Sequence, residues 1–302
     1  MKAIHCGPGS SPETLTLREM PKPIPRDKEV LVRVEAASVT RGDLALRQIP
    51  KLILVPLGLV LGFKPMRIPG VEFSGVVEAV GKGVSLFKVG DGIMGTTTGL
   101  AFGANAEYVC VPERRRSGVV ALKPEGLSHQ DCAVLPVGGM TALQNLARLK
   151  PRPGYRLMVY GAAGSVGSYA VQLGAWYGAE VTAVCGTANQ ELASDLGAAR
   201  ALDYTAPDWP ERAGSFDGVF DAVGKLPRAI GRRLLVPGGR WTSVRAPTSE
   251  TDADLALLIR LASEGQLKPL VDRIYTLAQV PDAHRYVGSG RKRGNLAIQV
   301  RD

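Results

Sequence analysis

Residues 159–173 read VYGAAGSVGSYAVQL, and this stretch decides the fold. An apolar run ends at its start, glycine and alanine residues follow, and the apolar positions after Ser165 have the spacing of a helix with one buried face. The pattern predicts a buried strand, a tight turn and the start of a helix. Such a turn lets the backbone approach a diphosphate, whose charge meets the N–H groups and positive dipole end of the helix.

The turn follows the spacing G-x-G-x-x-G, with Ala162 in the register of the first glycine and Gly164 and Gly167 in those of the other two. A similar turn without a bound nucleotide occurs in other doubly wound proteins, so this alternative stays open. We expect a dinucleotide cofactor to be held here by Gly161, Ala162, Ala163, Gly164, Ser165, Val166 and Gly167.

The composition indicates a globular protein. The chain has 302 residues, of which 45% are hydrophobic, enough for two domains with a large core. Its net charge of +9 favours anionic partners, but the basic clusters at residues 114–116, 232–233 and 291–293 are far apart and lack an aromatic-rich binding motif. We therefore expect solvated surface charge and no primary role in nucleic-acid binding.

Residues 52–63 are the most apolar stretch, yet this stretch is too short to span a membrane and contains Pro56. We expect it to line a pocket, with no membrane association. The first six residues have no apolar signal core, which favours a cytoplasmic location. Four cysteines and three histidines are widely spaced without a C-x-x-C pair, so neither a metal cluster nor a disulfide scaffold is predicted.

The two halves of the chain have different patterns. Short β-rich runs separated by Gly and Pro between residues 28 and 122 predict a barrel-like β domain. After Pro153 strands alternate with helices, which predicts a parallel sheet with right-handed crossovers. Ser128 followed by Asp131 resembles a capping box, with a second helix expected over 141–149. In the second half we expect strands at 156–160, 180–185, 200–203, 216–222 and one ending at 244.

Taken together, these motifs resemble the medium-chain dehydrogenase/reductase superfamily, in its zinc-free quinone oxidoreductase (zeta-crystallin-like) branch, over nearly the whole chain. The resemblance implies an α/β fold, with a Rossmann doubly wound parallel sheet over residues 124–270 and a GroES-like β-barrel domain over 1–123, completed by 271–302. It rests on Ala36–Thr40 with Asp43, Ile68–Gly75, Val89–Asp91, Leu135–Ala142, the glycine turn, Phe216–Asp217, Pro237–Gly239 and Arg293–Asn295.

Metal-dependent members of this superfamily carry a cysteine near the position of Thr40 and a histidine where this chain has Val71. The cysteine-rich lobe that binds structural zinc is also absent, because residues 99–106 contain no cysteine. Without zinc as a Lewis acid, hydride transfer needs an acceptor that is already electrophilic. The resemblance therefore implies an enzyme that reduces a small-molecule quinone or α,β-unsaturated carbonyl compound, whose oxyanion is stabilised by hydrogen-bond donors.

The choice of cofactor depends on the end of the second Rossmann strand, where NAD enzymes place a carboxylate. Residues 185–189 read CGTAN and leave room for a 2′-phosphate, so NADPH is the expected cofactor and NADH the alternative. Gln190 stands where relatives often have Lys or Arg; Arg200 is the candidate substitute, and modest selectivity is expected. By resemblance, the residues around the phosphate are Gly186, Thr187 and Tyr204.

Two threonines are the candidate catalytic residues. By resemblance, Thr141 orients the nicotinamide and Thr40 donates a hydrogen bond to the substrate oxygen, while Asn295 contacts the cofactor. A simple helix N-cap is the other interpretation of Thr141. Asp43 is either a buried carboxylate paired with an arginine or a catalytic acid. No side chain stands out as a proton donor, and solvent is expected to supply the proton.

Residues 245–250 lead straight to a helix, where relatives usually have a longer segment with a strand that pairs across a homodimer, so the usual dimer is in doubt. A short-chain dehydrogenase is excluded because no tyrosine has a lysine four residues later. A methyltransferase is disfavoured because Cys185 or Gly186 stands where it needs an acidic residue. A nucleotide-binding protein of the same fold without turnover stays open.

Overall fold

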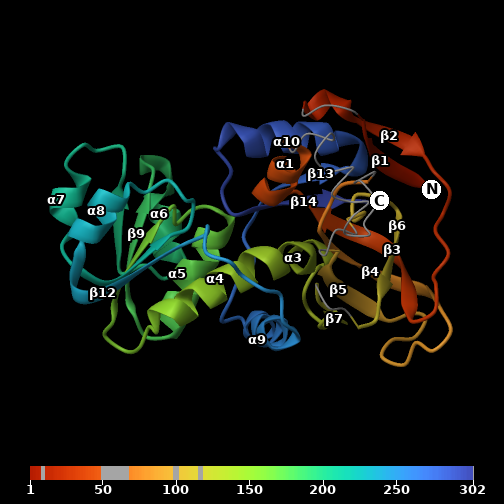
Figure 1. The fold of residues 1–302 in the computed structure, drawn as a ribbon, viewed down its shortest axis with the longest axis horizontal. Helices are drawn as coiled ribbons and strands as arrows, with labels where there is room; N and C mark the ends of the chain where they lie inside the picture. The colour runs from red at the N-terminus through yellow and green to blue at the C-terminus, as the bar shows by residue number, and fades with distance from the viewer. Residues whose placement is uncertain (8–10, 49–67, 98–101, 115–117, 302) are drawn as a thin grey trace. The chain divides into compact units, whose positions relative to one another are not determined.

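The structure is a computed structural model that describes residues 1–7, 11–48, 68–97, 102–114 and 118–301 (Figure 1). Its contacts divide the chain into two compact units, residues 1–137 with 250–259 and 271–302, and residues 138–249 with 260–270. This division falls after residue 137 and places residues 124–137 in the first unit. The expected domain boundary after residue 123 stays a prediction. The expected pocket wall at 52–63 lies outside the described residues.

The first unit is built on a β-sheet whose strands run in the order β13-β14-β3-β4-β5-β7, with β6 paired to β3 and a separate β1-β2 hairpin. In β3 the alternate residues Val30, Val32 and Val34 are fully buried, as expected for a strand with one face on a core. The strands are β1 (Lys2–Cys6), β2 (Leu15–Glu19), β3 (Glu29–Ser38), β4 (Glu72–Val80), β5 (Gly92–Thr96), β6 (Tyr108–Pro112), β7 (Val120–Leu122), β13 (Val271–Thr276) and β14 (Asn295–Gln299).

Among the described residues, three helices longer than one turn also lie wholly within this unit. Helix α1 (Arg41–Gln48) and helix α10 (Val280–Ser289) contact each other, and the guanidinium of Arg47 lies 3.2 Å from Nδ1 of His284. Helix α3 (His129–Val134) begins at the predicted cap, because Ser128 Oγ accepts a hydrogen bond from the backbone N–H of Asp131. Residues 271–302 join the sheet through β14, which pairs antiparallel with β3. Helix α9 (Asp252–Ser263) is shared by the two units, since residues up to 259 belong to the first unit and those from 260 onward to the second.

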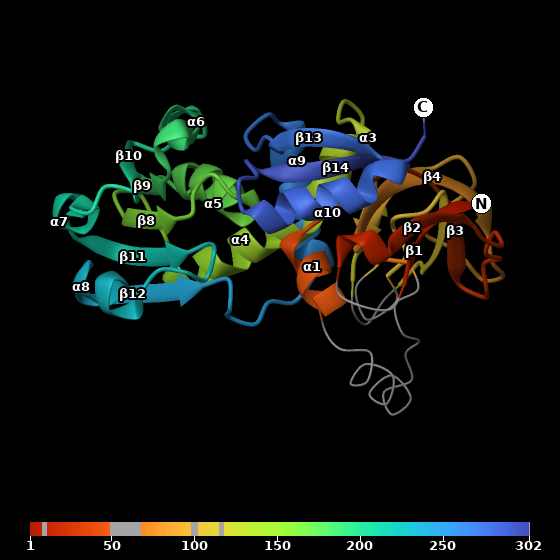
Figure 2. The same ribbon diagram turned by 90° about the horizontal axis from the view of Figure 1, so that it is seen from above.

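The second unit contains a parallel five-stranded sheet in the order β10-β9-β8-β11-β12, visible in Figure 2. This confirms the predicted Rossmann-like sheet. Because all pairings are parallel, the carboxyl ends of its strands meet at one edge, where such sheets bind ligands. The strands are β8 (Arg156–Tyr160), β9 (Glu180–Cys185), β10 (Arg200–Asp203), β11 (Phe216–Asp221) and β12 (Leu235–Ser243); the helices are α4 (Pro136–Leu149), α5 (Ser165–Trp176), α6 (Gln190–Asp195), α7 (Trp209–Ala213) and α8 (Arg228–Arg233).

Helix α4 begins five residues before the start expected at residue 141. Pro136 occupies its first turn, where a missing N–H costs nothing and the fixed φ of proline suits a helix. Thr141 therefore lies inside the helix, and its interpretation as an N-cap is wrong. Strand β12 likewise begins at Leu235, where only a turn was expected, and it ends at Ser243.

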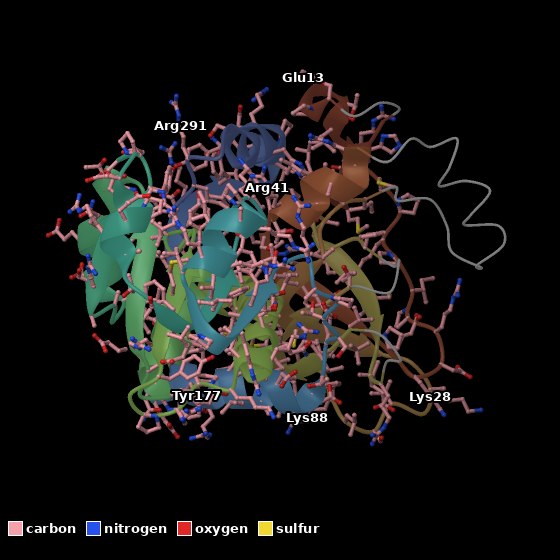
Figure 3. The ribbon with its side chains drawn as sticks, turned by 60° about the vertical axis from the view of Figure 1, so that its left-hand side comes forward. Glu13, Lys28, Arg41, Lys88, Tyr177 and Arg291 are labelled. Atoms are coloured by element: carbon pink, nitrogen blue, oxygen red, sulfur yellow. The ribbon has the colours of Figure 1, made fainter. Side chains whose placement is uncertain are left out.

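Exposed basic side chains project from several elements of the first unit. Figure 3 labels Lys28, Lys88 and Arg291, which belong to separate segments between helices and strands and are exposed to solvent. In the three basic clusters Arg114, Arg232, Arg233, Arg291 and Arg293 are exposed and Lys292 is half-buried, while residues 115 and 116 lie outside the described residues. In the part of the chain that the structure describes, no helix is both long enough and apolar enough to cross a bilayer.

Candidate functional site

The glycine turn lies across the carboxyl ends of β8 and β9. The backbone N–H groups of Gly161 and Ala162 donate to Val184 O at 2.8 and 3.2 Å. Gly161 has φ +80°, a conformation that L side chains rarely adopt, and a Cβ there would lie 2.5 Å from Cγ1 of Val223. The turn therefore requires glycine at position 161 for two independent reasons.

Helix α5 starts directly after this turn. Gly164 is its N-cap, with φ −80° and ψ 177°, and an added Cβ would have only Gly161 O nearby, at 3.4 Å. At Gly167, by contrast, a Cβ would lie 2.1 Å from Gly161 O, so the helix packs directly on the turn. The backbone over Gly164 is open at the N-terminus of a 12-residue helix, which suits a pyrophosphate.

Thr141 belongs to the same unit as the glycine turn. A Cβ at Gly138 would lie 2.7 Å from Ser165 Oγ, so the first turn of α4 packs against the start of α5. Thr141 is one helical turn further on and half-buried, and its carbonyl accepts a hydrogen bond from Asn145 Nδ2 at 2.9 Å. Its role toward a nicotinamide stays a prediction.

The three residues expected around a 2′-phosphate lie together. The backbone N–H of Tyr204 donates to Cys185 O at 3.0 Å, and the Tyr204 hydroxyl lies 3.4 Å from the position of a Cβ on Gly186. Thr187 and Tyr204 are exposed, so both are open to a ligand. The ring of Tyr160 lies 6.1 Å from that of Tyr204.

Two features of this end of the sheet differ from expectation. The hydroxyl of Thr187 donates to the carboxylate of Asp203, a residue that we did not identify from the sequence. Arg200 does not replace the missing phosphate ligand, because its guanidinium donates to Arg212 O and Ala213 O, at 2.6 and 3.4 Å. Arg200 starts β10 and Asp203 ends it, so the expectation for Arg200 is wrong.

Asp221 is a second residue that sequence analysis missed. It is buried at the carboxyl end of β11 and accepts hydrogen bonds from four consecutive backbone N–H groups, those of residues 223–226, at 2.8 to 3.3 Å. These bonds fix the loop that places Val223 beside Gly161. The sequence feature that could have indicated this role is an aspartate at the end of a strand, followed by a segment that contains Gly224.

In the first unit, Thr40 and Asp43 form a reciprocal pair at the start of α1. Asp43 Oδ2 accepts from Thr40 N at 2.7 Å and from Thr40 Oγ1 at 2.6 Å, while Asp43 N donates to Thr40 Oγ1 at 3.2 Å. Asp43 is 1% exposed, and burial raises the pKa of its carboxyl. Among the described residues no arginine forms an ion pair with Asp43, so its pairing with an arginine and its role as a catalytic acid both stay predictions.

Glu72 is a fully buried carboxyl group next to this pair in the fold. Its Oε2 lies 2.5 Å from Ser38 Oγ, and its Oε1 accepts from Val137 N at 2.7 Å. Burial, with smaller contributions from Asp43 and Glu250, raises the pKa of Glu72 to about 8. Glu72 is therefore mostly uncharged at neutral pH.

Asn295, the remaining predicted cofactor residue, opens β14 in the first unit and is 5% exposed. Its register partner is Val271 on β13. The neighbouring Lys292 donates to Gly294 O, and burial lowers the pKa of its ammonium to about 8. Contact of Asn295 with a cofactor stays a prediction.

The residues present do not fit a catalytic zinc ion. The two positions that supply cysteine and histidine in metal-dependent relatives hold Thr40, bonded to Asp43, and Val71, which is apolar and buried. Glu72 is already bonded to Ser38 and Val137. In the described ranges no group of three His, Cys, Asp or Glu side chains could hold a metal ion.

Comparison with known proteins identifies the family. The "Alcohol dehydrogenase GroES-like domain" model matches residues 26–124, and two "Zinc-binding dehydrogenase" models match 165–264 and 241–298. The chain is 31% identical to the "NADPH-dependent alkenal/one oxidoreductase, chloroplastic" of Arabidopsis thaliana, over 90% of this chain and 72% of that protein. It is 28% identical to the "Chloroplast envelope quinone oxidoreductase homolog" of the same plant, over 93% and 92%.

The structure of the quinone oxidoreductase from Coxiella burnetii is similar to the whole chain, with a TM-score of 0.86, 27% identity and coverage of 100% and 99%. The fold, the glycine turn and these relatives define a dinucleotide-dependent oxidoreductase. The chain belongs to the medium-chain dehydrogenase/reductase superfamily, as its motifs predicted, and uses a nicotinamide cofactor.

Proposed function

We propose that this enzyme transfers hydride from NADPH to quinones or α,β-unsaturated carbonyl compounds without zinc. The observation that carries the proposal is the open backbone cradle at Gly164, in a chain whose residues at positions 40 and 71 cannot form the family's zinc site. The names of the relatives support the acceptor class and the cofactor. A small molecule is the substrate, and a cytoplasmic location stays a prediction. A homodimer is possible, but the usual dimer stays in doubt, because no strand lies between β12 and α9.

The protein's own groups would bind and orient the reactants. The turn at 161–167 would hold the pyrophosphate, Gly186 and Thr187 the adenosine ribose, and Thr141 the nicotinamide, which supplies the hydride when bound. Thr40 would donate to the acceptor oxygen as negative charge develops there. When Asp43 is protonated, its proton can lie toward Thr40 Oγ1, which frees the threonine proton for the substrate.

The proposal predicts NADPH oxidation by 1,4-benzoquinone or a simple enone such as methyl vinyl ketone, followed by absorbance. Turnover should persist after dialysis against a strong chelator, because no metal is needed to polarise an already electrophilic acceptor. An alcohol with NADP⁺ is the control and should give no reaction. Cofactor binding without oxidation by any acceptor would favour a nucleotide-binding protein without turnover, and chelator-sensitive activity would contradict the zinc-free mechanism.

Thr40→Ala should lower kcat/KM by about tenfold or more, the loss expected for a hydrogen bond to a charged oxygen. The substitution also removes the cap of α1, which costs about 1 kcal/mol of folding free energy. Thr40→Ser keeps the hydroxyl and the cap, and it should restore most of the activity. If the alanine variant is as active as the wild type, Thr40 caps the helix and does not act on the substrate.

A further inference from the structure

A carboxylate occupies the end of β10, beside the residues expected to bind the 2′-phosphate of NADPH. Thr187 Oγ1 donates to Asp203 Oδ2, while Asp203 Oδ1 accepts from Thr205 N at 2.8 Å and Thr205 Oγ1 at 2.7 Å. These bonds, with that from Thr187 first, lower the pKa of Asp203. A full negative charge therefore lies next to the Thr187 hydroxyl at neutral pH.

The register of the sheet places this charge at the same level as the end of the second Rossmann strand. Asp203 pairs with Cys185 in the parallel β9-β10 ladder. In many NAD enzymes the strand that corresponds to β9 ends in a carboxylate, which accepts hydrogen bonds from the ribose. Here that position is Cys185-Gly186, and the carboxylate comes from the neighbouring strand instead. Residues 185–190 contain no acidic residue, so the carboxylate beside them becomes apparent only in the fold.

No described cation is placed to offset the Asp203 charge. Residues 185–190 contain no Lys or Arg, and the guanidinium of Arg200 binds carbonyls at the other end of β10. Tyr204 can offer only a neutral donor to a phosphate. The proton of the Thr187 hydroxyl is already donated to Asp203. A 2′-phosphate would thus approach a like charge, whereas a ribose 2′-hydroxyl could donate to it.

We propose that Asp203 determines the coenzyme selectivity of this enzyme, weakening the binding of NADPH relative to NADH so that both reduced coenzymes are accepted. This inference rests on the proposed function, because it requires a dinucleotide on the glycine turn. Charge repulsion across a solvated site is modest and is screened by salt. Removing the carboxylate should therefore tighten NADPH binding about threefold to tenfold at low ionic strength.

The test compares wild-type enzyme with Asp203→Asn by fluorescence titration with NADPH and with NADH, at low and high NaCl. Asparagine removes the charge and keeps an acceptor oxygen for the two Thr205 bonds, while its NH2 group can donate to Thr187 Oγ1 in place of the bond that Asp203 Oδ2 accepts. Asp195→Asn is the matched control, since Asp195 is an exposed residue at the last turn of α6 and its removal changes the net charge equally. We expect Asp203→Asn alone to tighten NADPH, with NADH changed less than about twofold and the gain reduced by salt.

The outcomes separate the two proposals. If the wild type binds both coenzymes and Asp203→Asn leaves their ratio unaltered, or weakens both equally, Asp203 only supports the Thr187–Thr205 segment and the inference is overturned. If Asp195→Asn tightens NADPH as much as Asp203→Asn, general charge is responsible and the inference also fails. If the wild type binds neither coenzyme, the proposed function fails, and the inference about Asp203 fails together with it.

Discussion

Gly164→Ala should abolish most coenzyme binding while leaving the fold intact. The backbone at Gly164 is extended, and the new methyl group would have only Gly161 O nearby, at 3.4 Å, an ordinary contact. Because Gly164 is the N-cap of α5 and alanine is less favourable than glycine there, the free energy of unfolding should fall by about 1 kcal/mol at most. The same methyl group would stand over the open backbone where the pyrophosphate is proposed to bind. Fluorescence titration with NADH should show a loss of affinity of about tenfold or more, equal to about 1.4 kcal/mol.

Gly167→Ala is the matched variant, because it adds the same methyl group in the same turn but against the protein. There Cβ would lie 2.1 Å from Gly161 O and 2.9 Å from Ala162 Cα, so backbone must move. This overpacking should cost about 1–3 kcal/mol of stability, measured by chemical denaturation. If Gly164→Ala leaves the coenzyme affinity unaltered, the pyrophosphate does not bind over Gly164. The stability of Gly167→Ala does not affect this conclusion.

The glycine turn could be predicted from the sequence because all of its parts are adjacent in the chain. A strand, a glycine turn and a helix that follow one another in the chain are specified by local spacing alone. Residues 156–160, 180–185 and 200–203 were predicted with the bounds the structure shows, because each is a short apolar or alternating run between clear breaks. The parallel order of the sheet then follows from general rules of connection.

The features that the sequence did not reveal depend on partners far away in the chain. Asp203 meets Thr187 only because β10 lies in register with β9, and a 16-residue separation gives no periodic signal. Glu72 was noted as part of a motif, but its burial is set by Ser38 and Val137, which come from β3 and the second residue of α4. Helices α7 and α8 were missed because five or six residues are too few to show a helical period.

Glu72 should make the enzyme less stable as the pH rises through neutrality. Its carboxyl has a pKa of about 8 in the folded protein and an ordinary value of 4.5 when exposed. Between these values the folded state holds a proton that the unfolded state has lost, so the free energy of unfolding decreases with pH by about 1.4 kcal/mol per unit. His284, whose pKa burial lowers to about 3, and His129, whose pKa burial also lowers, act in the opposite direction, and their contribution fades as the pH rises above the ordinary histidine value of 6.5.

Glu72 dominates the window from pH 6.5 to 7.5, because only the end of the histidine titrations and the beginning of that of Lys292, whose pKa is lowered to about 8, fall within it. Chemical denaturation followed by circular dichroism should show the wild type losing about 1 kcal/mol across the window. Glu72→Gln should remove this slope, because its amide can donate to Ser38 Oγ and accept from Val137 N as the neutral acid does. Exposed Glu125 provides the control Glu125→Gln, which should keep the wild-type slope.

The direction of the change in Glu72→Gln is as informative as its size. If Glu72 is neutral in the folded enzyme, glutamine reproduces its hydrogen bonds without the cost of desolvating a charge at higher pH, and the variant should equal or exceed the wild type in stability at pH 7.5. A variant that is strongly destabilised at both pH values, or that keeps the wild-type slope, would show that Glu72 is ionised in the folded state. Its carboxylate would then need a cationic partner, for which half-buried Lys292 is the first candidate to test by Lys292→Met.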